Sequence, residues 1–289
     1  MRKKRKGLIT TIVLVIALLV GLSVMLYPSF SDWWNQRVTS RAVANYDKVV
    51  AEMDHSDIDR MFARAEDFNA QLAEMYAPFS NTDELKRYDG ILNVSGTGIM
   101  GYITIPVINV ELPVYHGTSE GVLNVAVGHL KGSSFPVGGA STHAVLSAHT
   151  GLPSARLFTD LESLVVGDQF TITVLDRIFT YKVDDINVVL PHEMEKLAIV
   201  PDEDYVTLLT CTPYGINSHR LLVRARRIET VYEKTVLVSA DALKIDSYIV
   251  IGIVVAPLLL ILIILWGKRK PISIPLDDPL SVLPKRDGD

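Results

Sequence analysis

The sequence predicts a mainly β domain, folded as a closed barrel or a sandwich, with a helical segment before it and a membrane-spanning helix on each side. Hydrophobic residues make up 48 % of the 289 residues, and their excess lies in two apolar blocks, one near each end of the chain. Between the blocks, from Gly101 onward, short β-prone runs alternate with turn residues, as they do in barrels and sandwiches. A chain of this length has room for one good-sized domain plus accessory segments.

The N-terminal block is predicted to be an uncleaved membrane anchor within residues 1–27. Lys and Arg fill residues 2–6, and residues 7–27 carry no charge, which is long enough for a helix to cross a bilayer. A secretory signal peptide begins in the same way, but residues 26–30, Leu-Tyr-Pro-Ser-Phe, form a poor cleavage site. A cleaved signal peptide is the alternative.

The C-terminal block is predicted to be a second membrane-spanning helix. Residues 247–266 are strongly apolar and have no polar face, which disfavours a buried core helix, and a basic triplet follows at residues 268–270. Because basic residues flank both blocks on their terminal sides, the positive-inside rule places both termini in the cytoplasm and residues from about 28 to 246 outside. Residues 233–246 are then a linker, and residues 267–289, rich in Pro and charge, a disordered cytoplasmic tail.

The segment at residues 28–92 is predicted to be helical over residues 33–76 and to pack against the domain that follows. Ser56 or Asp57 is the expected N-cap. The apolar side chains that form the packing face recur at spacings of three and four: Ile58, Met61, Phe62, Ala65, Phe68, Leu72 and Met75.

The β domain is expected at residues 93–232. No Gly-rich phosphate loop follows a β-prone run, and no His, Cys or Asp cluster has the spacing of a zinc site, so we expect no cofactor and no metal. The net charge of −5 leaves no long basic face and argues against a nucleic-acid partner. The β-prone runs are residues 101–105, 143–147, 169–174, 178–183, 205–210 and 221–225.

Cys211, the single cysteine, is the first candidate for a catalytic residue. A lone cysteine excludes a disulfide within the chain and is by default a small buried hydrophobic residue. Here it ends the run at residues 205–210, just before Thr-Pro-Tyr-Gly at residues 212–215, so the thiol is expected at a rim that substrate can reach. A thiol needs a neighbouring imidazole or cation to react near neutral pH.

His149 and Arg220 are the best candidates for the imidazole and the cation that would assist the Cys211 thiol. His149 lies where an apolar run gives way to a turn, and a hairpin from Thr210 to Leu221 would return Arg220 beside Cys211. A guanidinium there could stabilise an oxyanion or hold a substrate carbonyl. The pattern alone leaves open a surface-loop histidine and an arginine at a hairpin end.

Two segments resemble the signature of the sortase family. Residues 207–220 read Thr-Leu-Leu-Thr-Cys-Thr-Pro-Tyr-Gly-Ile-Asn-Ser-His-Arg, and sortases carry a Thr-Leu-x-Thr-Cys strand followed by an Arg about nine residues on. Residues 146–158 resemble the family's histidine segment, and residues 101–106 and 112–118 resemble its opening strands. The resemblance covers roughly residues 95–230 and implies a sortase-type closed β-barrel with short helices.

Within that family the chain is similar to class C, the pilin-polymerising enzymes of Gram-positive bacteria. The residues after the cysteine, the helical segment before the barrel and the second span after it all fit. The resemblance implies cleavage of an LPxTG-like sorting signal after Thr, a thioacyl enzyme, and attack by a pilin lysine to give an isopeptide bond. Its expected partners are therefore pilins or surface proteins with such signals, together with the lipid bilayer.

The resemblance also implies a role for each site residue. Cys211 is the nucleophile, His149 the general acid and base, and Arg220 the group that stabilises substrate or oxyanion. Thr210, from the same motif, helps to position substrate.

One departure from class C concerns a lid, which in these enzymes precedes the barrel and covers the cysteine with an Asp-Pro-aromatic motif. The matching residues 76–80 read Tyr-Ala-Pro-Phe-Ser, with Ala77 in place of the Asp, followed by Pro78 and Phe79. The resemblance implies that the Asp anchors the lid electrostatically. We therefore expect a lid that is held more loosely, with Phe79 still plugging the groove. An ordinary linker is the alternative.

Three other functions stay open. A housekeeping sortase would anchor surface proteins to the cell-wall precursor, but such enzymes usually have one membrane anchor and no lid. A non-catalytic, membrane-tethered pilus assembly or adhesion module would leave the Cys-His-Arg set idle. A plain cysteine protease would use water in place of the amine.

Overall fold

A computed structural model of the chain describes residues 2–94, 96–230, 257 and 259. The chain divides into two units: Met1–Leu26 with Lys244–Asp289, and Tyr27–Leu243. The second unit contains the β domain. The predicted linker, second span and cytoplasmic tail lie outside the described residues, apart from residues 257 and 259.

Two long helices open the chain, α1 (Arg2–Ala51) and α2 (His55–Glu74). Among the described residues, α1 is the one helix that is long and apolar enough to cross a membrane, as expected for the predicted anchor. The predicted helix over residues 33–76 is interrupted at residues 52–54, and the expected N-cap at Ser56 or Asp57 is wrong. Asp54 caps α2 instead, because its carbonyl accepts the backbone N–H groups of Asp57 and Ile58.

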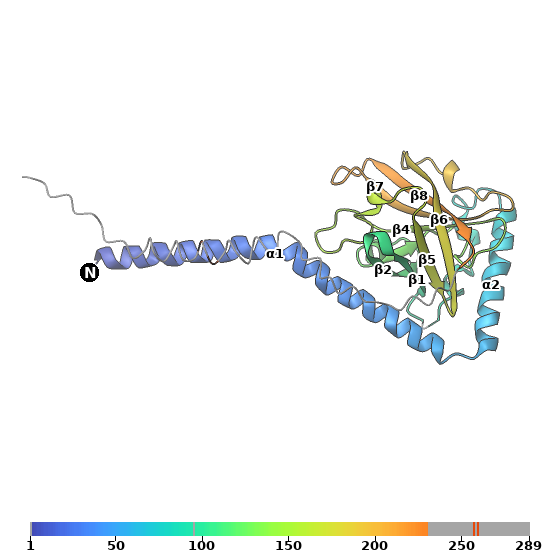
Figure 1. The fold of residues 1–289 in the computed structure, drawn as a ribbon, viewed down its shortest axis with the longest axis horizontal. Helices are drawn as coiled ribbons and strands as arrows, with labels where there is room; N and C mark the ends of the chain where they lie inside the picture. Colours follow the sequence, from blue (N-terminus) through green and yellow to red (C-terminus); the bar gives the residue numbers. More distant parts are fainter. Residues whose placement is uncertain (1, 95, 231–256, 258, 260–289) are drawn as a thin grey trace, which may run out of the picture. The chain divides into compact units, whose positions relative to one another are not determined.

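The β domain is a closed eight-stranded barrel with the strand order β1-β2-β3-β4-β7-β8-β6-β5, which excludes the sandwich (Figure 1). Each of the six predicted runs falls within a strand, whereas the three-residue β3 has no recognisable pattern. The strands are β1 (Ile99–Ile105), β2 (Val110–His116), β3 (Val127–His129), β4 (Thr142–Ser147), β5 (Gln169–Val174), β6 (Arg177–Val189), β7 (Asp204–Thr212) and β8 (His219–Ile228).

Short helices fill the connections of the barrel. They are α3 (Glu120–Leu123) and the 3-10 turns η1 (Thr82–Glu84), η2 (Tyr88–Gly90), η3 (Pro106–Ile108), η4 (Leu161–Ser163) and η5 (Glu195–Leu197).

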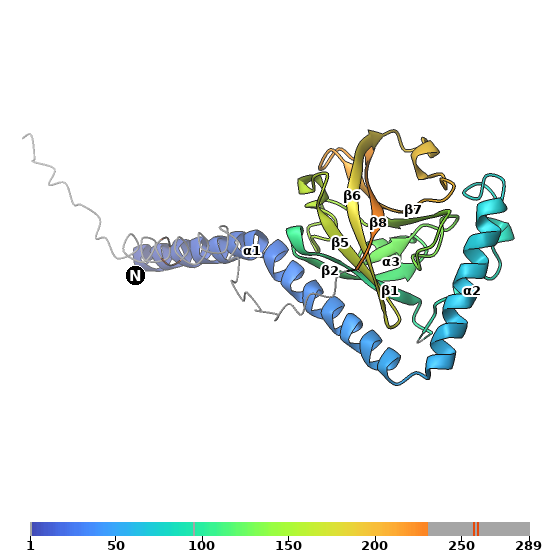
Figure 2. The same cartoon turned by 45° about the vertical axis from the view of Figure 1, so that its right-hand side comes forward.

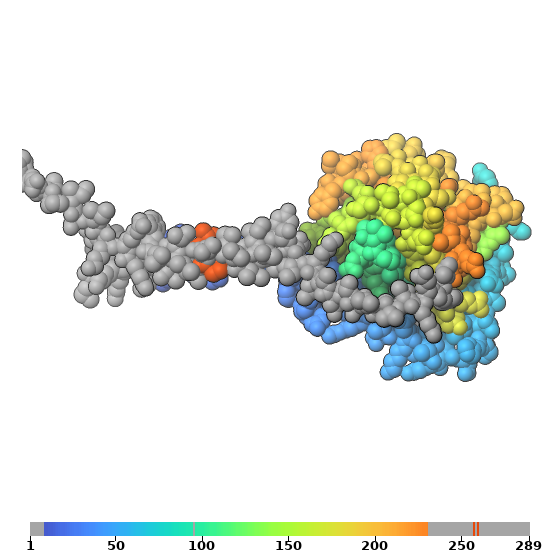
Figure 3. Space-filling view, viewed as in Figure 1, coloured from blue at the N-terminus to red at the C-terminus, as the bar shows by residue number. Residues whose placement is uncertain are grey.

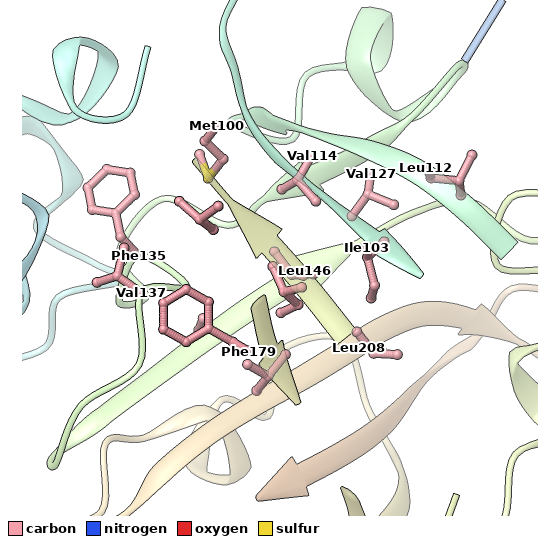
Figure 4. Packing of buried hydrophobic residues seen from close by; sticks show 14 of the residues in the cluster. Met100, Ile103, Leu112, Val114, Val127, Phe135, Val137, Leu146, Phe179 and Leu208 are labelled. Carbon is pink, nitrogen blue, oxygen red and sulfur yellow. The ribbon is translucent and has the colours of Figure 1, made fainter. Parts of the chain in front are cut away.

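The interior of the barrel is filled with apolar side chains. Ile103, Val114, Leu146 and Leu208 are completely buried and converge from different strands (Figure 4). On the face drawn in Figure 3, the side chains of the domain leave no open channel. A packed interior has no room for substrate, so chemistry must take place on the outside of the barrel or at its rim.

Helix α2 lies along the outside of the barrel (Figure 2). It buries five residues of the predicted packing face together with Asn69, which the prediction did not include, whereas Met61 and Met75 are only half-buried. Asn69 of α2 forms two hydrogen bonds with the backbone of Phe135, in the segment before β4. Its Nδ2 donates to the Phe135 carbonyl at 3.0 Å, and its Oδ1 accepts the Phe135 N–H at 2.7 Å. The predicted partner of this helix, the domain that follows it, is thereby confirmed.

A buried aromatic cluster fastens the segment after α2 to strand β3. The ring of His129 is fully buried, its Nε2–H donates to the Ser134 carbonyl at 2.8 Å, and its Nδ1 lies 2.9 Å from the hydroxyl of Tyr88 in η2. Phe135 stacks on the same ring, with the ring centroids 5.2 Å apart. Burial lowers the pKa of His129 to about 4 because the charged ring would lose its hydration.

This buried histidine predicts that acid destabilises the domain. In the unfolded chain His129 binds a proton below about pH 6.5, whereas in the folded chain it stays neutral down to about pH 4. Folding is therefore favoured above that window and weakened as pH falls through it, by about 1.4 kcal/mol per pH unit. We expect the thermal unfolding midpoint of the detergent-solubilised chain to fall less steeply with pH in His129→Gln than in the wild type. His192→Gln, at an exposed loop position, is the control, and parallel curves for wild type and His129→Gln would contradict the assignment.

Candidate active site

Cys211 lies on the outer face of the barrel, one residue before the end of β7. Side chains alternate along a strand, and Leu208 and Thr210 point inward and are buried. Leu209 and Cys211 therefore point outward, and both are half-buried. The thiol is thus at an accessible rim, as the sequence predicts.

Arg220 is paired directly with Cys211 across the antiparallel strands β7 and β8. Its Nη1 donates to the carbonyls of Asn217 and His219, at 3.2 and 3.1 Å. Among the described residues no carboxylate lies within ion-pair distance of this guanidinium. Its remaining N–H groups can serve a bound carbonyl or oxyanion.

His149 approaches Cys211 from the other side of β7. Strand β4 runs parallel to β7, with Ser147 opposite Leu209, and Ala148 continues the pairing by donating its N–H to the Leu209 carbonyl at 3.1 Å. The recorded pairing ends there, one residue before His149, at the end of β7 that carries Cys211. Cys211 and Arg220 are therefore paired in the sheet, and His149 begins the loop that leaves the neighbouring strand at the same end.

Thr210 ties the His149 segment to β7. Its side chain is 1 % exposed, and its hydroxyl donates to the carbonyl of Ala148 at 2.8 Å. The hydroxyl is directed at the residue before His149, so we expect Thr210 to position substrate only through that segment.

The loop that begins at His149 is closed on itself. The N–H of Phe158 donates to the His149 carbonyl at 3.1 Å, and the N–H of Gly151 donates to the Thr159 hydroxyl at 3.1 Å. An isolated antiparallel bridge joins Leu152 to Ala155 nearer the tip. Residues 149–159, called the histidine loop below, therefore form one hydrogen-bonded unit.

Two contacts around this site are not foreseen from the sequence. Gly151 has a φ of +73°, and a Cβ there would lie 3.1 Å from the ring of Tyr214, so the glycine allows the β7–β8 loop to pack on the histidine loop. Thr212, next to Cys211, donates its hydroxyl to Glu162 at 2.7 Å. The only sequence signal for the first contact is a glycine in the turn after the histidine.

The predicted lid forms a tight turn against the outer face of the barrel. Ala77 has a φ of +48°, and its carbonyl accepts the N–H groups of Ser80 and Asn81 at 2.9 and 3.2 Å. The half-buried Phe79 packs tightly on Gly132, where a Cβ would lie 3.0 Å from the Phe79 ring. Pro78 is half-buried beside it.

The apolar surface that receives Phe79 belongs to the same face as Cys211. Its centre is Val145 on β4, Leu197 in η5 and Leu222 on β8, and both Phe79 and Leu209 pack on it. Leu209 precedes Cys211 by two residues on one face of β7, which is about 7 Å along a strand. The lid residue thus occupies the apolar surface that leads up to the thiol.

Comparison with known proteins finds similarity to sortases. The sortase domain matches residues 103–228. The crystal structure of sortase C1 from Streptococcus agalactiae is 47 % identical, with a TM-score of 0.62, and the match covers 66 % of this chain and 100 % of that one. The structure of sortase C from Streptococcus pneumoniae, described as informative on catalysis and pilin substrate specificity, is 44 % identical with a TM-score of 0.59, over 66 % and 97 % of the two chains. Sortase A of S. agalactiae is 25 % identical over 80 % of this chain and 91 % of its own.

The hydrogen bond from Thr210 to the Ala148 carbonyl should stabilise the attachment of the histidine loop to β7. In Thr210→Val the Ala148 carbonyl loses its hydroxyl partner, so the end of β4 should open more often. We expect amide hydrogen exchange over residues 146–151 to be at least about fivefold faster than in the wild type, as for the loss of one buried hydrogen bond. Thr210→Ser keeps the hydroxyl and should exchange near the wild-type rate; equal rates in the Val and Ser variants would refute the role of the bond.

Proposed function

We propose a function from one premise: the chain belongs to the sortase family, whose members are cysteine transpeptidases, and its structure matches those of class C. We infer that it cleaves an LPxTG-like sorting signal through a thioacyl intermediate on Cys211 and transfers the acyl group to a pilin lysine. The product is an isopeptide bond between pilin subunits. The observation that carries the proposal is the placement of Cys211 between Arg220 on β8 and the His149 segment on β4.

The first half-reaction forms the thioacyl enzyme. The Cys211 thiol passes its proton to His149, its sulfur attacks the carbonyl carbon of the signal's Thr, and Arg220 stabilises the resulting oxyanion from the neighbouring strand. His149 gives a proton to the amine of the departing Gly as the peptide bond breaks. The Thr carbonyl is then bonded to sulfur, and the C-terminal fragment leaves.

The second half-reaction reverses these roles. A lysine ε-amine attacks the thioester carbonyl, His149 accepts a proton from the incoming nitrogen, and the Cys211 sulfur is released. An acyl group has then passed from one amine to another, with no net consumption of water. Neither half-reaction uses a cofactor or metal.

The acceptor is the point on which class C differs from a housekeeping sortase. The Phe79 turn over the apolar surface and the similarity to S. pneumoniae sortase C support a pilin lysine, and thus a role in pilus assembly on the cell wall. A sortase that anchors surface proteins to cell-wall precursor is the second candidate, supported by the weaker similarity to sortase A.

The choice of acceptor can be measured directly. We expect the full chain, given a fluorescent LPxTG peptide and equal amounts of a lysine-bearing pilin peptide and a glycine-bearing peptide, to form mainly the lysine isopeptide product. Mass spectrometry of the products identifies the linkage. A predominance of the glycine product would favour the housekeeping function, and hydrolysis unaffected by either amine would favour a protease.

We also propose that the enzyme is anchored in the cell membrane of a Gram-positive bacterium with its catalytic domain outside. The apolar part of α1 supports one anchor. The second span is inferred from the apolar run at residues 247–266, and the cytoplasmic placement of both termini from the two basic clusters. Within this arrangement residues 28–92 form the segment with the lid and residues 93–232 the catalytic domain.

The turn at residues 77–79 is proposed to act as the lid over Cys211. Phe79 holds it by apolar contact with the surface around Leu222. Ala77 has no charge with which to stabilise the closed lid. Its backbone is in a left-handed conformation that Asp tolerates better than Ala does. An Asp at this position should therefore close the lid more firmly.

Because Cys211 is the only cysteine, its alkylation reports the lid without interference. We expect Phe79→Ala to raise the rate of labelling by iodoacetamide at least about fivefold, since closure loses its apolar contact, and Ala77→Asp to lower it. Tyr76→Ala is the matched control, because that neighbouring aromatic side chain is 89 % exposed. The lid is disproved if Ala77→Asp does not slow labelling or if Phe79→Ala behaves like Tyr76→Ala.

A further inference from the structure

The tip of the histidine loop is bonded to helix α1. The carbonyl of Ser154 accepts hydrogen bonds from the Ser31 hydroxyl, at 3.1 Å, and from the amide of Asn35. Two residues on, the N–H of Arg156 donates to the carboxylate of Asp32 at 2.9 Å. Helix α1 thus satisfies an acceptor and a donor of the loop backbone through three side chains.

These three residues extend the stripe by which α1 packs on the barrel. Further along the helix the stripe is apolar: Val43 is buried, and Tyr46 and Val50 enter the main core cluster. At Ser31, Asp32 and Asn35 the same stripe becomes polar and half-buried. The change from apolar to polar coincides with the point where the helix meets the histidine loop.

The opposite side of the same turns is aromatic and open. Phe30, Trp33 and Trp34 are 61 %, 49 % and 56 % exposed. At 3.6 residues per turn they lie roughly opposite the polar stripe. Attachment of the loop to the helix therefore depends on polar contacts and not on burial of these large rings.

The position of the tip is transmitted to His149 through the loop itself. The bridge between Leu152 and Ala155, the bond from Gly151 to Thr159 and the bond from Phe158 to the His149 carbonyl join the tip to the base. At the base, Thr210 holds Ala148. The His149 backbone is thereby fixed from two sides, by β7 and by α1.

We propose that Ser31, Asp32 and Asn35 are positioning residues for His149, through which helix α1 sets the activity of the site. The inference rests on the proposed function for its meaning, but it concerns a different part of the molecule. The three residues act on His149 through the loop backbone, by their bonds to Ser154 and Arg156. Their bonds hold the histidine loop at the distance from Cys211 that proton transfer requires, and transfer rates fall steeply when such groups are displaced.

The first turns of α1 after the predicted anchor would then support catalysis and would not be only a spacer between the membrane and the barrel. The predicted anchor ends at residue 27, and Ser31 follows four residues later, just before Asp32, the first charged residue after Lys6. Conditions that disturb these turns should lower the rate of the chemical step while leaving substrate binding intact.

Full chain in lipid nanodiscs provides the test. The variants are Asp32→Ala, Asn35→Ala and the double variant, with Asp32→Asn as the conservative change, because an Asn oxygen can still accept the Arg156 N–H. Asp59→Ala is the matched control: this carboxylate also joins the helical segment to the barrel, through Arg177 at 3.0 Å, but Arg177 is at the start of β6, outside the histidine loop.

We expect the double variant to lower kcat for thioacyl formation from a sorting-signal peptide by about tenfold, with KM unchanged, since each bond alters an equilibrium by about two- to tenfold. Asp32→Asn should retain most of the rate, and Asp59→Ala all of it. The proposal is overturned if the double variant matches the wild type, if Asp59→Ala is slowed as much, or if KM changes in place of kcat.

A second readout separates this proposal from the proposed function. The pH dependence of Cys211 alkylation needs no peptide and reports the neighbouring imidazole. We expect its midpoint to shift in the double variant and not in Asp59→Ala; an unchanged midpoint counts against the positioning role. A wild-type enzyme that forms no acyl product would refute the transpeptidase reaction and leave this readout unaffected.

Discussion

The pairing of β7 between β4 and β8 is the constraint on which the rest of the structure depends. Antiparallel pairing with β8 sets Arg220 opposite Cys211, and parallel pairing with β4 brings the His149 segment to the other side. Side chains alternate in a strand, so a slip of one residue would turn Cys211 into the packed interior. The completely buried residues Leu146 and Leu208 oppose that slip, and the core of the barrel therefore enforces the register of the site.

Because the interior is full, everything that regulates access must act from outside the barrel. We propose that two N-terminal elements do so at different places. The lid turn sets Phe79 on the apolar surface beside Leu209, and α1 binds the tip of the histidine loop through Ser154 and Arg156. In this account one element controls whether substrate reaches the thiol, and the other controls whether the imidazole is in place when it does.

Local sequence signals predict the parts of this arrangement that are close together in the chain. The hairpin that joins Cys211 to Arg220 follows from a β-prone run, a turn and a second run. The pairing of β4 with β7, which brings the His149 segment to the Cys211 end of β7, has no such local signal, because about sixty residues separate Ser147 from its partner Leu209. Only the family resemblance predicts that His149 and Cys211 act together. Asp32 and its partner Arg156 are even further apart in the sequence, and no local pattern predicts their contact. The N-cap at Asp54 was missed because Ser56 and Asp57 are equally good capping residue types, and only the backbone conformation selects Asp54.

The most direct test of the central claim is mass spectrometry of the full chain after incubation with a sorting-signal peptide. We expect one new mass, equal to the peptide acylated through its Thr, on the proteolytic fragment that contains Cys211. Hydroxylamine should release it, and Cys211→Ala should lack it, with Arg220→Ala and His149→Ala accumulating much less. An adduct on another residue, or peptide cleavage by Cys211→Ala at the wild-type rate, would contradict the account.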